Sequence, residues 1–252
     1  MSDTIASLPP PHQPMARLRR PRPRTILLLA LALVAAKVFV TILVEYRFYF
    51  PADFQSTFLH GREATFAGLY AIAFYTHLIV APTTLLLAVL LVTTGRKPNP
   101  AASKWHRVAG RVQFGLVVFL LVPSGLVMAT HALAGPVAAV GLVCLSLATG
   151  LSVAAAAVTA IGGHLRSHRR WAIRSAILLG SPLLLRFATG AAFVIQRDTP
   201  GFYRLNAWAS WLLPLACYEV WCYYHGHASK LPWSLSKFVS PRRYRHGSPH
   251  LD

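Results

Sequence analysis

The chain has 252 residues, of which 55% are hydrophobic and only 13% are charged. A soluble domain normally carries about 25% charged residues, so much of this chain meets a solvent other than water. The formal charge of +18 does not indicate nucleic-acid binding, because arginine and lysine gather in the two tails and at the ends of apolar runs. That distribution is typical of membrane topology and favours contact with anionic lipid headgroups.

Six apolar runs are long enough to cross the hydrocarbon layer, which takes about 20 residues in a helix. No stretch alternates polar and apolar residues as the strands of a membrane barrel do, so the runs predict helices. A basic, proline-rich tail at 1–24 cannot bury a core, and a second basic tail occupies 226–252. The membrane domain between them, residues 25–225, is expected to hold helices at 25–44, 67–91, 105–133, 137–160, 171–195 and 206–224.

The connections between these runs alternate in charge. Basic residues fill both tails and two of the loops, whereas most of the acidic residues fall in the other connections: Glu45, Asp53, Glu63 and Asp198. The positive-inside rule then places both chain ends and the basic loops in the cytoplasm. The sequence therefore predicts an all-α, six-helix membrane bundle with both termini inside.

Four ionisable residues fall inside the apolar runs, where their cost makes each a functional candidate: Lys37, His77, Arg186 and Glu219. Counted along the helices, the first three come to about 10–15 Å below the outer surface, with no intramembrane acid among them. Two interpretations are open. The cations extend to the interface while His77 bonds to a neighbouring helix, or all three surround an anionic or carbonyl-bearing guest such as haem propionates, a quinone or a lipid headgroup.

Glu219 lies deeper, in the inner half of the bilayer. The nearest basic residue at its depth is Arg174, at the start of the fifth apolar run. We expect a structural ion pair between Arg174 and Glu219, with a proton-relay carboxylate as the alternative.

Two cytoplasmic segments look alike, since each places a histidine beside arginine and tryptophan where an outward-running helix begins. His106 and His168 should therefore lie at similar depth. Two imidazoles facing each other across a helix bundle suit the axial positions of a b-type haem, with arginines nearby to neutralise its propionates. We therefore expect haem b on His106 and His168, compensated by Arg107, Arg111 and Arg174. The alternative is two interfacial histidines bonded to headgroups or backbone.

Other histidines offer weaker possibilities. His164 lies one helical turn from His168 and is a substitute for it, and His131 is a possible partner of His77 in a second, outer site. The three cysteines lie in apolar runs without metal-ligand spacing and are expected to be small buried hydrophobes. No phosphate-binding glycine loop, catalytic carboxylate pair or His-Glu-x-x-His motif is present. An enzymatic role is thus restricted to membrane oxidoreduction.

Several blocks resemble a bacterial family. After His77 come residues 104–111 (KWHRVAGR), 168–175 (HRRWAIRS), 185–187 (LRF) and 217–221 (CYEVW). Together they are similar to the predicted-membrane-protein family of unknown function numbered twenty-three-zero-six, over about 66–221. One departure is Ala172, where the family usually has methionine. The resemblance implies a bacterial inner-membrane protein in which six positions matter: His77, His106, His168, Arg174, Arg186 and Glu219.

A looser likeness to di-haem cytochrome b and ferric-reductase proteins is one of architecture. The leading hypothesis is a haem-bearing carrier of electrons between a quinone or other small donor and a partner. In it, His77, Arg186 and Lys37 form the outer site. The alternatives are a cofactor-free transporter, an anionic-lipid-binding protein, and an assembly or scaffold protein whose polar residues only fix helix packing.

Overall fold

The computed structural model describes residues 23–56, 58–95, 100–132 and 134–228, which divide into two compact units between Tyr46 and Arg47. The tails expected at 1–24 and 226–252 therefore lie almost wholly outside the described residues. The first unit holds one described helix, α1 (Pro23–Glu45), whose surface is mostly exposed and apolar. Lys37 is exposed on it, and its backbone carbonyl accepts a hydrogen bond from Thr41 Oγ1 at 3.0 Å.

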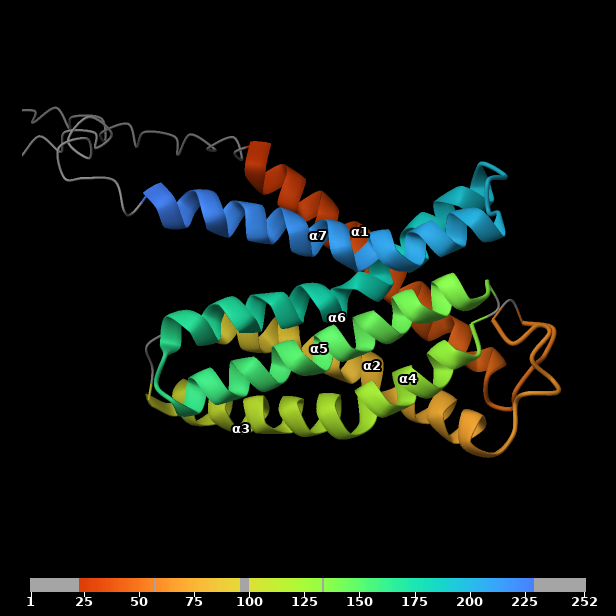
Figure 1. Ribbon diagram of the computed structural model, residues 1–252, viewed down its shortest axis with the longest axis horizontal. Coiled ribbons are helices and arrows are strands. Elements are labelled where there is room, and N and C mark those ends of the chain that lie inside the picture. Colours follow the sequence, from red (N-terminus) through yellow and green to blue (C-terminus); the bar gives the residue numbers. More distant parts are fainter. Residues whose placement is uncertain (1–22, 57, 96–99, 133, 229–252) are drawn as a thin grey trace, which may run out of the picture. The chain divides into compact units, whose positions relative to one another are not determined.

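The second unit is a helical bundle, drawn in Figure 1 with its elements labelled. One of its rods is interrupted by a π-helical turn, which follows from Pro123: proline lacks an N–H and crowds the carbonyl four residues earlier, so the helix widens there. The elements are α2 (Gly68–Thr94), α3 (Pro100–Leu116), the π turn η2 (Val117–Leu121), α4 (Val122–Thr130), α5 (Pro136–Ile161), α6 (Leu165–Val194) and α7 (Pro200–Ala228).

Length and apolar composition make the chain a polytopic helical membrane protein. Five described segments suit a membrane crossing: Thr25–Phe48, Gly68–Thr94, Lys104–Thr130, Pro136–Ile161 and Leu165–Val194. They correspond to the first five apolar runs. The sixth run lies within α7, which is long enough at 29 residues but is less apolar because it carries Arg204, Asn206 and Glu219.

Three helices begin five or six residues earlier than the apolar runs predict. The fifth run predicts a start at Trp171, but α6 begins at Leu165, and α3 and α7 begin at Pro100 and Pro200. Apolar runs mark only the part of a helix that lies in hydrocarbon, whereas arginine is itself a good helix former and continues the helix beyond it. Proline at the first helical position favours the starts of α3 and α7, because its fixed φ suits the helix and its missing N–H would have no helical partner there.

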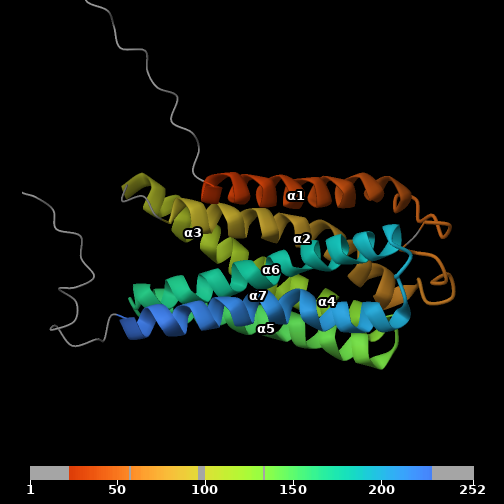
Figure 2. The ribbon, with the colours of Figure 1, turned by 90° about the horizontal axis from the view of Figure 1, so that it is seen from above.

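The second unit has two chemically different ends. Figures 1 and 2 both show α2 ending and α3 beginning where α5 turns into α6, and the other connections lying at the opposite end. The first end, here called the basic end, carries Lys104, Arg107, Arg111, Arg166, Arg169 and Arg170. The opposite end, the aromatic end, carries the 47–67 loop, where Phe58 stacks on Phe74 with ring centroids 5.6 Å apart.

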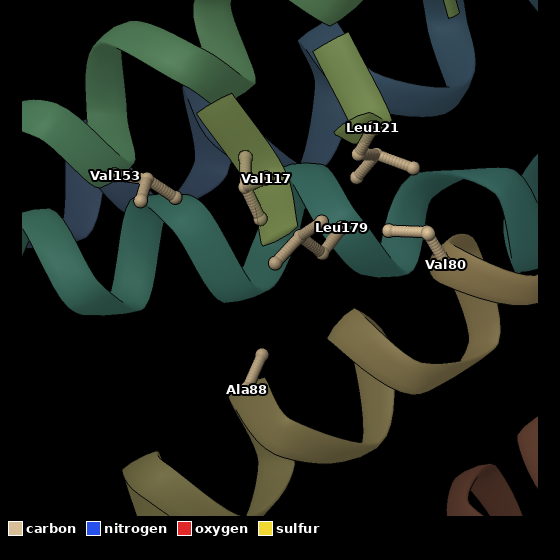
Figure 3. Packing of buried hydrophobic residues seen from close by; sticks show 6 residues of the cluster. All are labelled: Val80, Ala88, Val117, Leu121, Val153 and Leu179. Atoms are coloured by element: carbon tan, nitrogen blue, oxygen red, sulfur yellow. The ribbon is translucent and has the colours of Figure 1, made fainter. Parts of the chain in front are cut away.

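Between the two ends lies a cluster of six buried apolar side chains, here called the apolar plug. Figure 3 shows these side chains turned toward one another: Val80, Ala88, Val117, Leu121, Val153 and Leu179. They come from α2, the π turn, α5 and α6, so the plug holds four rods together. Buried apolar side chains that pack together leave little room for water, so the plug separates the polar groups on its two sides.

Helix α7 packs against α5 and α6. Trp208 lies directly on Gly141 of α5, where a Cβ atom would come within 2.9 Å of the indole nitrogen. That nitrogen donates a hydrogen bond to the carbonyl of Val137 at 3.0 Å. The glycine thus permits the close approach that fixes α7 against the bundle.

Candidate functional site

His106 and His168 lie together near the basic end. Their ring centroids are 6.4 Å apart and the ring planes are nearly perpendicular, at 87°. The two residues come from α3 and α6, and in the described residues these helices pack against α5 and α2 but not against each other. The two imidazoles therefore lie close together although their helices do not pack against each other, as their matching sequence surroundings predict.

The proton on His168 is assigned by its hydrogen bond. Nδ1 lies 2.8 Å from the carbonyl oxygen of Ala156 on α5. A carbonyl can only accept, so Nδ1 carries the hydrogen and, in the neutral ring, Nε2 keeps a lone pair. Histidines that bind metals are held in this way, with the second nitrogen bonded to a carbonyl or carboxylate.

His106 is held differently. Its Nδ1 is buried and has no hydrogen-bond partner in the described part of the chain. The ring packs on Gly95, the residue that ends α2, where a Cβ atom would lie 3.1 Å from Cε1. A buried polar atom without a partner is uncommon in proteins and indicates a missing water, ion or ligand.

Gln113 extends this face of α3, because a spacing of seven residues is close to two helical turns. Its amide nitrogen donates to the carbonyl of Thr84 at 3.1 Å. Its Oε1, like His106 Nδ1, is buried and lacks a partner among the described residues. The inward face of α3 thus presents two unsatisfied polar atoms at the basic-end side of the plug.

The arginines expected around the histidine pair have different positions. Arg107 and Arg111 are exposed on α3, and helical geometry turns them about 100° and 140° away from His106. His164, the predicted substitute for His168, is exposed and packs on Gly162, where a Cβ atom would lie 2.9 Å from Nδ1. His168, and not His164, is the ring that faces His106.

Arg174 forms an ion pair with Glu219. Its Nε and Nη2 donate to the two carboxylate oxygens at 2.6 and 2.8 Å, a bidentate geometry. The guanidinium also lies over the ring of Trp171, 4.4 Å from the centroid. The pair expected from the sequence is therefore present, and it joins α6 to α7.

His77 and Arg186, which were predicted to share an outer site with Lys37, contact different side chains. His77 Nδ1 lies 3.2 Å from Ser124 Oγ on α4. The guanidinium of Arg186 lies over the ring of Phe58, 5.5 Å from its centroid. Lys37 belongs to the first unit.

His131 is not turned toward His77. Its ring packs against Tyr70 with centroids 4.7 Å apart, and its Nδ1 lies 3.1 Å from the carbonyl of Val127. The structure thus gives the two histidines different partners.

Sequence reasoning overlooked Arg62, a buried arginine at the aromatic end. Its guanidinium donates to Tyr70 Oη at 2.8 Å and to the carbonyl of His131 at 2.9 Å, and Nε donates to the carbonyl of Phe58 at 3.0 Å. It therefore ties the 47–67 loop to α2 and to the end of α4. An arginine in a loop rich in aromatic residues was the only signal in the sequence, and the same loop also holds Arg47.

The family model described as "Predicted membrane protein (DUF2306)" matches residues 74–222. The match covers more than half of the chain, which therefore belongs to this family and is a multi-pass membrane protein. It includes His77, both histidines of the basic-end pair, and the Arg174–Glu219 ion pair. Neither the curated proteins nor the solved structures contain a significant match to the chain.

Proposed function

We propose that this member of the DUF2306 family is a b-type haem protein that carries electrons in the membrane, with His106 and His168 as the axial ligands. The observation that supports the proposal is the 6.4 Å spacing of the two imidazoles. Nitrogen–metal bonds of about 2.0 Å on opposite sides of one ion put the ring centres about 6.2 Å apart, if each centroid lies about 1.1 Å behind its nitrogen. The spacing therefore fits one metal ion between the rings.

The set of donors favours haem over a bare metal ion. The described residues contain no group of three or more His, Cys, Asp or Glu side chains that could hold a metal. A structural zinc ion needs four protein ligands, whereas a macrocycle brings four nitrogen ligands of its own and needs two from the protein. Two histidines without a third ligand among the described residues match the needs of a haem, not those of a zinc ion.

The protein's own groups would prepare this site in two ways. The carbonyl of Ala156 holds His168 with Nε2 free to bind iron, and the backbone at Gly95 supports the His106 ring. Bound there, the haem would supply a one-electron couple. Arg107 and Arg111 would balance its propionates from the flanks of α3, because the charge of Arg174 is already matched by Glu219.

The apolar plug supports electron transfer over transport, the alternative function. On the α3–η2–α4 rod, Val117 and Leu121 of the plug fall between Gln113 and Ser124, and on α5 Val153 precedes Ala156, whose carbonyl bonds His168. A hydrated solute would require this layer to open. An electron crosses a packed apolar layer without any such opening.

The proposal includes the orientation of the protein in the membrane. α7 would be the sixth crossing, and the basic end would face the cytoplasm by the positive-inside rule, with both termini on that side. Anionic lipid headgroups would then meet the basic end. The haem would lie near the cytoplasmic surface, where a partner protein can reach it.

An absorption spectrum tests the function. Protein purified from cells supplied with haem should show a Soret band and, on reduction with dithionite, sharp bands of six-coordinate, low-spin b-type haem. The ratio of haem to protein should approach one. A folded, monodisperse sample without reducible bands would end the proposal.

A substitution at Gly95 tests how the His106 ring is supported. Its φ of −62° suits alanine, so the effect should come from the new Cβ, which would lie 3.1 Å from Cε1 of His106 and 3.1 Å from the carbonyl oxygen of Leu91. We expect G95A to lower the haem-to-protein ratio severalfold because the ring must shift. Gly110, where a Cβ atom would meet nothing within 4 Å, provides the control G110A. Equal haem content in G95A and G110A would contradict this account of His106.

A further inference from the structure

Lys37 places a positive charge at the middle of the first candidate membrane span. This span runs from Thr25 to Phe48, so Lys37 lies twelve residues from one end and eleven from the other. Each end is therefore about 17 Å away along the helix axis, and half the thickness of the hydrocarbon layer is about 15 Å. The stem of a lysine reaches about 6 Å, so the ammonium cannot extend from here to the interface.

The side chains around Lys37 on α1 are apolar and exposed. Leu33, Val40 and Val44 share its helical face and are 70%, 56% and 51% exposed. Thr41, one turn further along, donates its hydroxyl to the backbone carbonyl of Lys37 at 3.0 Å. Within the described ranges the ammonium of Lys37 forms no ion pair. Charged side chains at this depth are costly and are almost always paired.

The acidic residues of this chain lie elsewhere. The sequence has seven of them, and Glu219 already bonds Arg174 through both carboxylate oxygens. The other six lie in the tails, in the connections or at the end of α1: Asp3, Glu45, Asp53, Glu63, Asp198 and Asp252. A second copy of the chain would bring the same lysine to the same depth, where like charges repel. A carboxylate that matches Lys37 therefore has to come from another protein.

Helix α1 is also distinct from the part of the chain that carries the histidine pair. It belongs to a compact unit of its own. The match to the family model begins at residue 74, after the end of α1. An interaction through α1 therefore does not depend on haem or on the proposed electron-carrier function.

We propose that the face of α1 around Lys37 docks a membrane-spanning helix of another protein, which carries an aspartate or glutamate at the middle of the bilayer. The carboxylate would pair with the ammonium in hydrocarbon, where no water screens the two charges. Leu33, Val40 and Val44 would pack against apolar side chains of the partner helix. Because Lys37 fixes the depth of the pair, this face selects a partner by the position of its acid.

Binding of synthetic single-span helices to the full-length protein in phosphatidylcholine vesicles tests this surface. The probe is a leucine–alanine helix of about 20 residues with one aspartate at its centre. One matched helix has asparagine in that place, and another has the aspartate two turns nearer one end. Energy transfer between labelled protein and labelled helix measures binding. We expect the central aspartate to bind at least about tenfold more tightly than either matched helix, because a hydrogen bond between charged groups is lost in both.

Two variants of the protein show whether Lys37 is responsible. K37M keeps the length of the side chain without its charge and should abolish the preference for the central aspartate. K104M removes an exposed lysine from the basic end and should leave that preference unchanged.

Several results would overturn the proposal. These are equal binding of the aspartate and asparagine helices, a preference that survives in folded K37M, and a preference that ignores the position of the aspartate. Loss of the preference when phosphatidylglycerol is added to the vesicles would overturn it in favour of anionic lipid headgroups. Energy transfer between copies of the protein that K37M abolishes would overturn it in favour of a second copy.

Discussion

Replacing His168 with alanine is expected to remove the low-spin haem spectrum. The variant keeps His106, but one imidazole leaves the second axial position open, and the contact with Ala156 that fixes the ligand ring is lost. We expect haem content after purification to fall at least tenfold, or the remaining haem to become high-spin. Pyridine haemochrome content and the reduced-minus-oxidised spectrum measure both effects. H106A should behave in the same way.

The matched control is H164A, which removes an exposed histidine one helical turn away on the same strongly basic segment. His164 immediately precedes the first residue of α6, and its ring is not the one that lies beside His106. We expect an unchanged spectrum. If H164A bleaches the protein and H168A does not, the axial pair is wrongly assigned; if neither variant bleaches a haem-bearing protein, the basic-end site does not hold the haem.

The sequence was enough to predict that His106 and His168 lie together. Each lies near the start of a helix that leaves the basic end, and the bilayer fixes depth along a helix so strictly that equal offsets in sequence become equal depths. The same reasoning predicted the pairing of Arg174 with Glu219. In a membrane protein, the depth of a residue in the bilayer is nearly determined by its position along the helix.

Rotation about the helix axis was not determined in this way. His77 and Arg186 share a predicted depth, yet His77 bonds to Ser124 while Arg186 lies over Phe58 in the 47–67 loop. Depth cannot tell which neighbour a side chain faces. Ser124 is a small, common residue in apolar runs, and nothing in the sequence indicated that its hydroxyl, which bonds to its own helix, also faces His77.

One pattern in the sequence did carry this information. His106 and Gln113 are seven residues apart, as are Ser124 and His131, so each pair lies on one face of the long α3–η2–α4 rod. Both members of the second pair contact α2: Ser124 contacts His77 and His131 contacts Tyr70, and these two α2 residues are themselves seven positions apart. Spacing therefore predicts which residues share a face of a rod, but not which other rod that face contacts.

Breaking the Arg174–Glu219 ion pair is expected to destabilise the fold markedly. The side chains are 19% and 44% exposed, and E219L would leave a guanidinium near hydrocarbon without its bidentate partner. Removing one member of a buried pair costs about 3–5 kcal/mol, and the exposure of Glu219 reduces our expectation to about 2–3 kcal/mol. Unfolding in mixed micelles measures the change, with R169L, which removes an exposed arginine from the same helix, as the control.

The double variant R174L/E219L shows whether the pair has any role besides packing. Two leucines remove both charges, so stability should return to within about 1 kcal/mol of the parent, because an apolar replacement of a whole ion pair is often neutral. If the guanidinium acts only on Glu219, the haem midpoint potential of this stable variant should equal that of the parent. A lower potential would mean that Arg174 also stabilises the reduced haem, as the sequence indicates. Failure of the second leucine to restore stability would show that Arg174 contributes mainly through its contact with Trp171.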